Sequence, residues 1–173
     1  MPPSISLGEL HDSMEKRFIV DKTLGRLAKW LRALGFDTTV FPGTDLHRLI
    51  RLSQEEGRII LTRNRKLEAK LFLGHILVLK RNQPDLQVRD VLQTLSLSAE
   101  PERFLSRCLR CNEMLESVPR REVEDRVPEF VFHSHEVFHR CPACHRIYWE
   151  GSHPVDMRKK ISELLKPVRD LPT

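Results

Sequence analysis

Two pairs of cysteines constrain the fold of this chain more than any other feature of its sequence. Cys108 and Cys111 form one C-x2-C pair, and Cys141 and Cys144 form another farther along the chain. The first residues show no apolar export signal, so we expect the thiols to be reduced rather than joined in disulfides. Two such pairs are typical of four thiolates around one tetrahedral Zn²⁺ ion. The sequence therefore predicts a structural zinc ion, because four cysteine ligands leave the metal no open position for catalysis.

Histidines crowd the second cysteine pair and offer alternative zinc ligands. They are His133, His135, His139 and His145. A histidine is able to replace a cysteine, but four cysteines at this spacing already complete a tetrahedral site. We therefore expect these histidines to lie at the surface or to make hydrogen bonds.

The part of the chain before the cysteines alternates between strand-like and helix-like patterns. Phe18-Ile19-Val20 is an apolar run too short for a helix, and the leucines and alanine that follow it recur at helical spacing. We expect strands at 17–21, 36–41, 58–62 and 75–80, helices at 23–34, 44–56 and 65–72, and a further helix from Pro84. This alternation predicts an α/β fold with a parallel sheet that helices cover on both faces.

The pattern changes after Leu97, and Pro101 interrupts the chain. We expect three parts: a flexible lead-in at 1–16, an α/β domain at 17–100, and a zinc ribbon with a closing helix at 101–173. In the last part, Val131-Phe132 and 146–149 are expected to be strands, and 154–166 a helix with Met157, Ile161, Leu164 and Leu165 inward. A unit of this size with one thiolate cluster folds on energy that the metal supplies.

The positive charge is unevenly distributed. The net charge is +5, and residues 108–173 hold eleven Lys and Arg against eleven Asp and Glu, so the excess lies earlier in the chain. A basic first part suggests a polyanionic partner, of which nucleic acid is the obvious candidate. Five residues are predicted to contact its phosphates, namely Arg26, Lys29, Arg32, Arg63 and Arg65. The alternative for the first three is a solvated helix face.

Polar residues that can bind a cation follow three of the expected strands. Asp21 ends the first strand, Asp45 comes just after the second, and Asn64 follows the third. The carboxyl ends of parallel strands lie at one edge of the sheet, where ligands gather. Carboxylate and amide oxygens suit Mg²⁺ or Mn²⁺, which activate water and neutralise phosphodiester charge. The competing interpretation is structural: Asp21 caps a helix, and Asp45 sits in a first helical turn after Thr44 as N-cap.

Several motifs together carry a resemblance to a known family. They are Phe18-Ile19-Val20-Asp21, Leu24-Gly25-Arg26-Leu27-Ala28-Lys29-Trp30-Leu31-Arg32, Gly35-Phe36-Asp37, Leu61-Thr62-Arg63, Arg107-Cys108-Leu109-Arg110-Cys111-Asn112, Cys141-Pro142-Ala143-Cys144 and Tyr148-Trp149-Glu150-Gly151-Ser152-His153. With these motifs the chain resembles the Mut-seven C-terminal RNase family over roughly 17–157. The resemblance implies a PIN-like nuclease domain followed by a zinc ribbon.

The resemblance also implies metal-dependent hydrolysis of RNA. Asp21 matches the family's first acid and Asp45 its second, but Asn64 stands where the third acid is expected. Asn offers a carbonyl oxygen without a negative charge, so the Mg²⁺ or Mn²⁺ site should be weaker. Three glutamates are able to compensate in principle: Glu55, Glu56 and Glu68.

The function expected from the sequence is thus a metal-dependent ribonuclease. Asn64 also favours a rival hypothesis, a non-catalytic RNA-binding or adaptor protein on a degenerate PIN-like scaffold. A third hypothesis, a zinc-dependent protein-interaction module, predicts no affinity for RNA and no salt response. The chain contains no apolar run long enough to span a membrane, so we expect no membrane partner and a cytoplasmic location.

Overall fold

The computed structural model describes residues 16–73 and 75–166, and the side chains of 70–73 are left aside. The expected lead-in at 1–16 therefore lies almost wholly outside the described residues. By its internal contacts the chain divides into two compact units, one ending at Arg103 and the other beginning at Phe104. None of the described helices is both long and apolar enough to cross a membrane.

The first unit is built on a four-stranded parallel sheet with the order β2-β1-β3-β4. Its strands are β1 (Arg17–Asp21), β2 (Thr38–Phe41), β3 (Arg58–Thr62) and β4 (Ile76–Val78). The helical segments are η1 (Lys22–Leu24), α2 (Gly25–Ala33), α3 (Leu46–Glu56), η2 (Arg65–Leu73), α4 (Pro84–Thr94) and η3 (Pro101–Arg103). The expected α/β class with a parallel sheet flanked by helices is confirmed.

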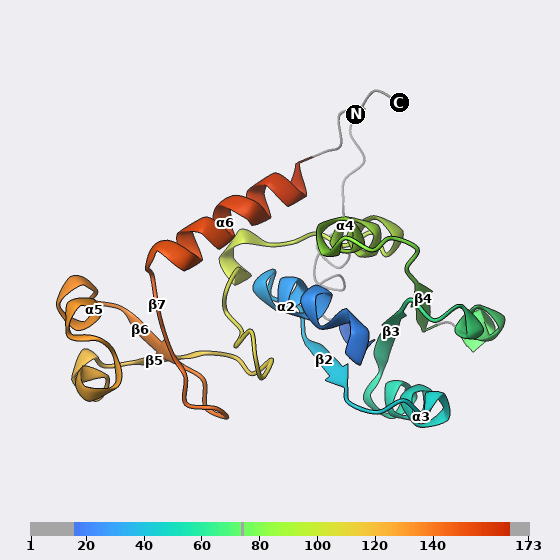
Figure 1. The fold of residues 1–173 in the computed structure, drawn as a ribbon, viewed down its shortest axis with the longest axis horizontal. Helices are drawn as coiled ribbons and strands as arrows, with labels where there is room; N and C mark the ends of the chain where they lie inside the picture. The colour runs from blue at the N-terminus through green and yellow to red at the C-terminus, as the bar shows by residue number, and fades with distance from the viewer. Residues whose placement is uncertain (1–15, 74, 167–173) are drawn as a thin grey trace, which may run out of the picture. The chain divides into compact units, whose positions relative to one another are not determined.

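The two faces of this sheet bury different side chains because successive strand residues point in opposite directions. Ile19 and Ile60 pack with Leu49 of α3 and Leu67 of η2 in one apolar cluster. Phe18 lies on the other face, where its ring meets Phe36 edge-on with centroids 5.8 Å apart. Helices α2 and α4 pack together, and Figure 1 shows them on the side of the sheet away from α3.

The strand order places a topological switch point between β1 and β3. The chain leaves β1 through α2 to reach β2 at the sheet's edge, and then returns through α3 to β3 on the other side of β1. Right-handed crossovers in opposite directions put α2 and α3 on opposite faces. In such doubly wound sheets, the carboxyl ends of the two central strands diverge and leave a crevice where ligands bind. Asp21 and Thr62 are the last residues of those two strands.

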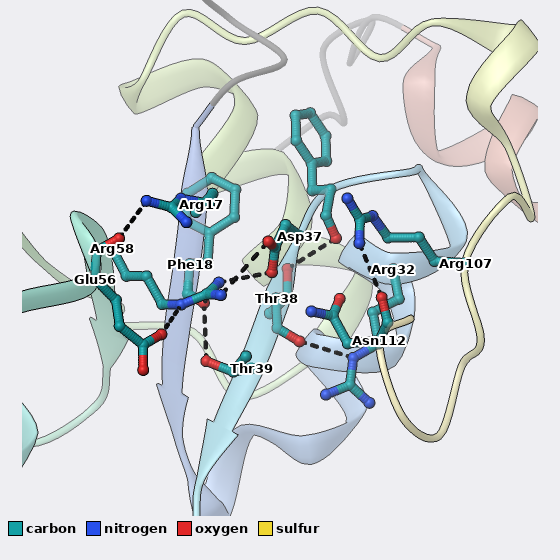
Figure 2. Close-up of polar contacts among 11 residues, drawn as sticks. Arg17, Phe18, Arg32, Asp37, Thr38, Thr39, Glu56, Arg58, Arg107 and Asn112 are labelled. Atoms are coloured by element: carbon teal, nitrogen blue, oxygen red, sulfur yellow. Dashed lines mark hydrogen bonds and ion pairs between the residues drawn. The ribbon is translucent and has the colours of Figure 1, made fainter. Parts of the chain in front are cut away.

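A buried arginine closes the opposite, amino-terminal edge of the sheet. Arg58 of β3 donates from Nη1 to Asp37 at 2.6 Å and to the Phe18 carbonyl at 3.3 Å, and pairs through Nε with Glu56 (Figure 2). Burial alone would lower the pKa of Arg58, but the hydrogen bonds to Asp37 and Glu56 outweigh it and raise the pKa. A buried pair of this kind is costly to break, because either partner left alone is an uncompensated charge. It is a structural ion pair.

Glycines end the two helices that lead into β2 and β3. Gly35, with φ +94°, follows α2, and Gly57, with φ +61°, caps α3. Residues with side chains rarely adopt this conformation, so both positions favour glycine. A Cβ atom on Gly35 would also lie 2.7 Å from the Cβ of Arg103. The two helices end at Ala33 and Glu56, within one residue of the ends expected from the sequence.

The second unit contains a three-stranded antiparallel sheet with the order β5-β6-β7. Its strands are β5 (Glu116–Val118), β6 (Phe138–Arg140) and β7 (Ile147–Trp149), and its helical segments are η4 (Arg120–Glu122), η5 (Glu124–Arg126), α5 (Glu129–Ser134) and α6 (Ser152–Leu165). Phe138 and Val123 are at most 1% exposed and form a small core with Val118 and Val131. Together with the cysteine cluster described below, this arrangement is consistent with a zinc ribbon.

Several local expectations for the second unit are wrong. Val131-Phe132 belongs to helix α5 rather than to a strand. Pro128 precedes Glu129 at the start of this helix, and burial of Val131 overrides the strand preference of β-branched and aromatic residues. Leu165 is 36% exposed at the end of α6, whereas Met157, Ile161 and Leu164 are buried as expected.

Candidate functional site

Asp21 is held at the end of β1 by its own sequence neighbours. Its Oδ1 accepts hydrogen bonds from the backbone N–H of Thr23 at 2.9 Å and from the Thr23 hydroxyl. The side chain therefore caps η1, which is the structural alternative that the sequence predicts for this residue. Its other oxygen, Oδ2, accepts from the hydroxyl of Thr62 at 2.8 Å. A carboxylate has about four acceptor sites, so these three bonds leave room for a cation.

Thr62 connects Asp21 to Asn64 across the two central strands. Its side chain is 1% exposed, and its Oγ1 also accepts from the backbone N–H of Asn64 at 3.0 Å. Asn64 in turn accepts at Oδ1 from the backbone N–H of Lys66 at 3.0 Å, at the start of η2. One chain of hydrogen bonds thus fixes the positions of Asp21 and Asn64 relative to each other.

Asp45 is the N-cap of α3, which corrects the expected start of that helix. Its Oδ1 accepts from the backbone N–H groups of His47 at 2.9 Å and Arg48 at 3.4 Å. Thr44, expected as the N-cap, lies one residue before it, and Asp45 is not in the first turn. Both residue types favour the cap position, and the carboxylate gains from the helix dipole as well. Among the described hydrogen bonds, those to Asp45 fall on Oδ1.

A pocket of about 350 Å³ opens at this edge of the sheet. Asp21, Thr62 and Asn64 line it, and Phe41 and Leu49 form part of its apolar wall. Asp45 is not among its lining residues, although Thr44 and Leu46 on either side of it are. The pocket therefore brings Asp21 and Asn64 together. Asp45 does not line it but lies between two residues that do, Thr44 and Leu46.

The glutamates considered as substitutes for a third acid do not line this pocket. Glu56 is committed to Arg58 at the other edge of the sheet, and Glu55 lies 3.9 Å from Arg51 on the exposed surface of α3. Glu68 is exposed on η2. None of these three glutamates therefore supplies the acid that is missing at Asn64.

The basic residues divide into exposed and buried ones. Arg26, Lys29, Arg63 and Arg65 are exposed, and Arg63 lines the pocket with Lys22. Arg32 is only 7% exposed, and its Nε donates to the carbonyl of Thr38 at 2.8 Å (Figure 2). The expectation that Arg32 lies on a phosphate-facing surface is wrong, because it fastens α2 to β2.

The four cysteines form one cluster in the second unit. Their Sγ atoms all lie within 4.8 Å of one another, and those of Cys108 and Cys144 are 3.8 Å apart. Four sulfurs placed about 2.3 Å from one zinc ion at tetrahedral angles would be about 3.8 Å apart. Among the described residues, this is the one group of three or more His, Cys, Asp or Glu side chains with metal-site spacing.

Each cysteine pair has the same backbone conformation. Cys111 donates its backbone N–H to the sulfur of Cys108 at 3.3 Å, and Cys144 donates to that of Cys141 at 3.5 Å. The next residue has a positive φ in both turns, 72° at Asn112 and 57° at His145, and its N–H bonds back to the first cysteine's carbonyl. The two turns are therefore equivalent, and N–H groups aimed at sulfur favour thiolates.

Without a cation, the thiols oppose each other's ionisation. Burial disfavours the Cys108 thiolate, but hydrogen bonds from Tyr148, at 3.0 Å, and from backbone N–H groups outweigh burial and lower the pKa of Cys108 to about 6. Burial and the neighbouring sulfurs of Cys144 and Cys108 raise the pKa of Cys111 to about 12. Burial also raises the pKa of Cys141. A dication removes this opposition, so the donor set fits a bound metal.

The motifs quoted above match a known protein family as a whole. The family model described as the Mut7-C RNAse domain matches residues 16–161. The chain belongs to this family. A search of curated proteins found no match.

The Mut7-C match runs from the residue before β1 to the middle of α6 and so includes both Asp21 and all four cysteines. The resemblance drawn from the motifs is confirmed. Sequence reasoning nevertheless missed three pocket residues of this Mut7-C domain, Lys22, Thr23 and Thr62. Thr62 was part of a quoted motif, but its hydroxyl contact with Asp21 depends on the pairing of β1 with β3.

Proposed function

We propose that this protein is a metal-dependent ribonuclease that hydrolyses RNA phosphodiester bonds at the pocket between β1 and β3. The observation that carries the proposal is a carboxylate, Asp21, oriented by Thr23 and Thr62 in a pocket at the switch point of the sheet. Membership of an RNase domain family supports RNA as the substrate class. In this proposal the first unit is a PIN-like nuclease domain at about 17–100.

The donor set fits a Mg²⁺ or Mn²⁺ ion in part. Asp21 would supply the charged oxygen, Asp45 a second one from the N-cap of α3, and Asn64 a neutral oxygen. When bound there, such an ion neutralises charge on the phosphodiester and activates water. The hydroxyls of Thr23 and Thr62 hold the Asp21 carboxylate in one rotamer, so the side chain would lose little conformational entropy when a substrate binds.

Exposed cations near the pocket would hold the RNA backbone. Lys22 and Arg63 line the pocket, and Arg65 follows two residues later. Arg26 and Lys29 are exposed on α2 and would add further phosphate contacts. Arg32 is left out of this surface because it is buried. Such contacts neutralise phosphates irrespective of sequence, so they would position the strand without selecting it.

The zinc ion and the cellular location belong to the same proposal. We infer that Cys108, Cys111, Cys141 and Cys144 bind a structural Zn²⁺, as their spacing and sulfur distances suggest. Thiols remain reduced in the cytoplasm, which is the location expected from the sequence.

One observation favours a second candidate function, binding of RNA without hydrolysis. The pocket contains one carboxylate, Asp21, with an amide at the position of the third family acid. A site with fewer charged oxygens binds a hard cation less tightly. In that case, Asn64→Asp would restore hydrolysis to a protein that only binds RNA.

A cleavage assay with a labelled single-stranded RNA and increasing Mn²⁺ tests the proposal. Wild type should cut the RNA, and Asp21→Asn should lower the rate at least about a hundredfold, equivalent to about 2.7 kcal/mol of barrier. Asp125→Asn, at an exposed position in η5 of the second unit, is the matched control and should cut normally.

Three other results would decide against hydrolysis at this pocket. Cleavage that survives Asp21→Asn would place the reaction elsewhere. Wild type that binds the RNA but leaves it intact at every Mn²⁺ concentration supports the second candidate, provided that Asn64→Asp then cuts. Wild type that neither binds nor cuts RNA would reject both candidates.

A further inference from the structure

The second unit contains a pocket of its own, and none of the four cysteines is among its lining residues. It measures about 130 Å³ and lies between the β6–β7 sheet, the chain before Cys108 and the first turns of α6. His139 of β6 and Tyr148 of β7 are opposite each other in the strand register and both line it. Leu109, Leu115 and Met157 supply apolar walls.

The size of this pocket suits a single flat ring. A protein cavity of about 150 Å³ lined by apolar side chains accepts benzene. Aromatic and apolar surfaces on several sides favour a planar occupant that can stack. Trp149 lines the pocket too, and its indole lies close to Gly151, where an added Cβ would lie 3.0 Å from its Nε1.

The polar groups of the pocket suit an uncharged ring with donors and acceptors. His139 and His153 both line it, and a neutral imidazole offers one donor and one acceptor. The charged side chains are already engaged: Arg158 lies 3.3 Å from Glu150, and Arg107 donates to the Asn112 carbonyl at 2.8 Å. Because residues 108–173 carry no net charge, phosphate attraction has little support here.

We propose that this pocket takes one unpaired base of a bound RNA strand, a contact made by stacking and base-edge hydrogen bonds rather than by charge. This inference rests on the proposed function, which makes RNA the substrate class. It assigns a role to the second unit beyond that of a zinc-stabilised fold. Recognition of single-stranded RNA commonly uses splayed bases that stack on aromatic side chains.

A matched pair of variants tests the pocket without touching the core or the cysteines. Val137 lines the pocket and is 60% exposed, and Val155 is 55% exposed on α6 but outside the pocket. Val137→Glu and Val155→Glu add the same charge at similar exposure within one unit. Binding of a labelled oligouridylate, measured by fluorescence anisotropy without divalent cations, should be about tenfold weaker for Val137→Glu than for Val155→Glu.

A second pair reports on base-edge contacts. His139→Ala removes a lining imidazole, whereas His133→Ala removes an exposed one on α5 that does not line the pocket. We expect about a fivefold loss of affinity for His139→Ala alone, with the slope of log affinity against log salt unchanged. Arg63→Ala should instead reduce that slope, because it removes a phosphate contact.

An abasic RNA strand of equal length separates the base from the backbone. It keeps every phosphate, so wild type should bind it more weakly and Val137→Glu should bind it no worse than Val155→Glu does. Circular dichroism and zinc content confirm that each variant is folded. Equal affinities of the two valine variants for oligouridylate would overturn the proposal that this pocket binds a base. The proposal would also be overturned if Val137→Glu weakened binding of the abasic strand as much as it weakens binding of oligouridylate.

The readouts also distinguish the two proposals. If wild type binds and cuts RNA while both valine variants bind it equally, the pocket is rejected and the ribonuclease stands. If RNA binds with the expected variant pattern but Mn²⁺ produces no cleavage, the pocket stands and hydrolysis is rejected. If wild type binds no RNA, the substrate class is wrong, and the base pocket is rejected with it.

Discussion

The cysteine cluster and the Asp21 pocket both gather metal-ligand side chains, but they are built in different ways. The cluster has four identical donors with all sulfurs within 4.8 Å, supplied by two turns of the same conformation. The Asp21 pocket has one carboxylate and one amide, and the second acid, Asp45, caps a neighbouring helix. The first is a closed set, and the second leaves coordination positions open.

In the proposed function, this difference separates a structural centre from a reactive one. A complete ligand set supplies folding energy and leaves no position for a substrate. An incomplete set holds a hard cation weakly, but water and phosphate oxygens are able to complete it. The sizes of the two apolar cores fit these roles. The first unit buries apolar side chains on both faces of its sheet, whereas the second unit has only a small apolar core and would depend more on a metal for its stability.

Removal of zinc should have the largest effect. Structural zinc sites supply roughly 10–16 kcal/mol of apparent binding energy, so a zinc chelator in excess Mg²⁺ should abolish the fold of the second unit. The β1–β4 sheet should persist because its core contains no cysteine. Far-ultraviolet circular dichroism and hydrogen exchange measure the two units separately. A second unit that keeps its exchange protection after zinc is lost would contradict the comparison.

Substitution of Asp45 separates its capping role from a metal-binding role. Asn caps a helix about as well as Asp, so Asp45→Asn should leave the melting temperature nearly unchanged while the Mn²⁺-dependent rate falls at least about tenfold. Asp45→Ala should lose about 1 kcal/mol of stability in addition. Thermal melts and the cleavage assay measure the two effects. An Asp45→Asn enzyme with a normal rate would leave capping as this residue's role.

The hydroxyl of Thr62 should matter because it orients Asp21. Loss of a partner that orients a metal ligand costs about tenfold or more in metal affinity or activity, so Thr62→Val should weaken Mn²⁺ binding by about that factor. Thr62→Ser keeps the hydroxyl and is the control. Isothermal titration with Mn²⁺ provides the measurement. Equal affinities for the Val and Ser variants would show that Asp21 needs no such orientation.

Asn64→Asp should make the open site more like the closed one. An added carboxylate beside Asp21 should tighten Mn²⁺ binding by roughly tenfold, equivalent to about 1.4 kcal/mol. Without metal, the same change places two carboxylates near each other and should lower the melting temperature slightly. Isothermal titration measures the gain in Mn²⁺ affinity, and thermal melts with and without Mn²⁺ measure the change in melting temperature. Unchanged affinity would place Asn64 outside the metal site.

Local patterns in the sequence determined most of the elements of this protein. The strands at Arg17–Asp21 and Arg58–Thr62 were predicted residue for residue, since short apolar runs bounded by turns have few alternatives. The cysteine spacing likewise predicted one cluster of four sulfurs, because each pair lies within a single turn. The prediction for Val131-Phe132 was wrong because packing overrode propensity in α5. Strand β6 was not predicted, because three residues with one apolar side chain carry no periodicity.

The candidate site was predicted only in part, for a related reason. The positions of Asp21, Asp45 and Asn64 at strand ends followed from the sequence, but the contact between Asp21 and Thr62 required β1 and β3 to be neighbours. The surface position predicted for Arg32 was wrong, because a helical pattern shows which side of a helix is apolar but not which backbone carbonyls lie beside it. Here the carbonyl of Thr38 accepts a hydrogen bond from Arg32. Likewise, Arg58 and Asp37 meet only because β1 lies between their elements.

The sequence by itself determined what the residues are able to do: four thiols that could hold one metal ion, and acids and bases suited to a polyanion and a cation. The tertiary structure decided which of them meet. Strand order, β2-β1-β3-β4, opens the crevice beside Asp21 and pairs it with Thr62. Hydrophobic periodicity along a strand specifies the face that is buried, whereas the neighbour of each strand depends on long-range packing that no local pattern contains.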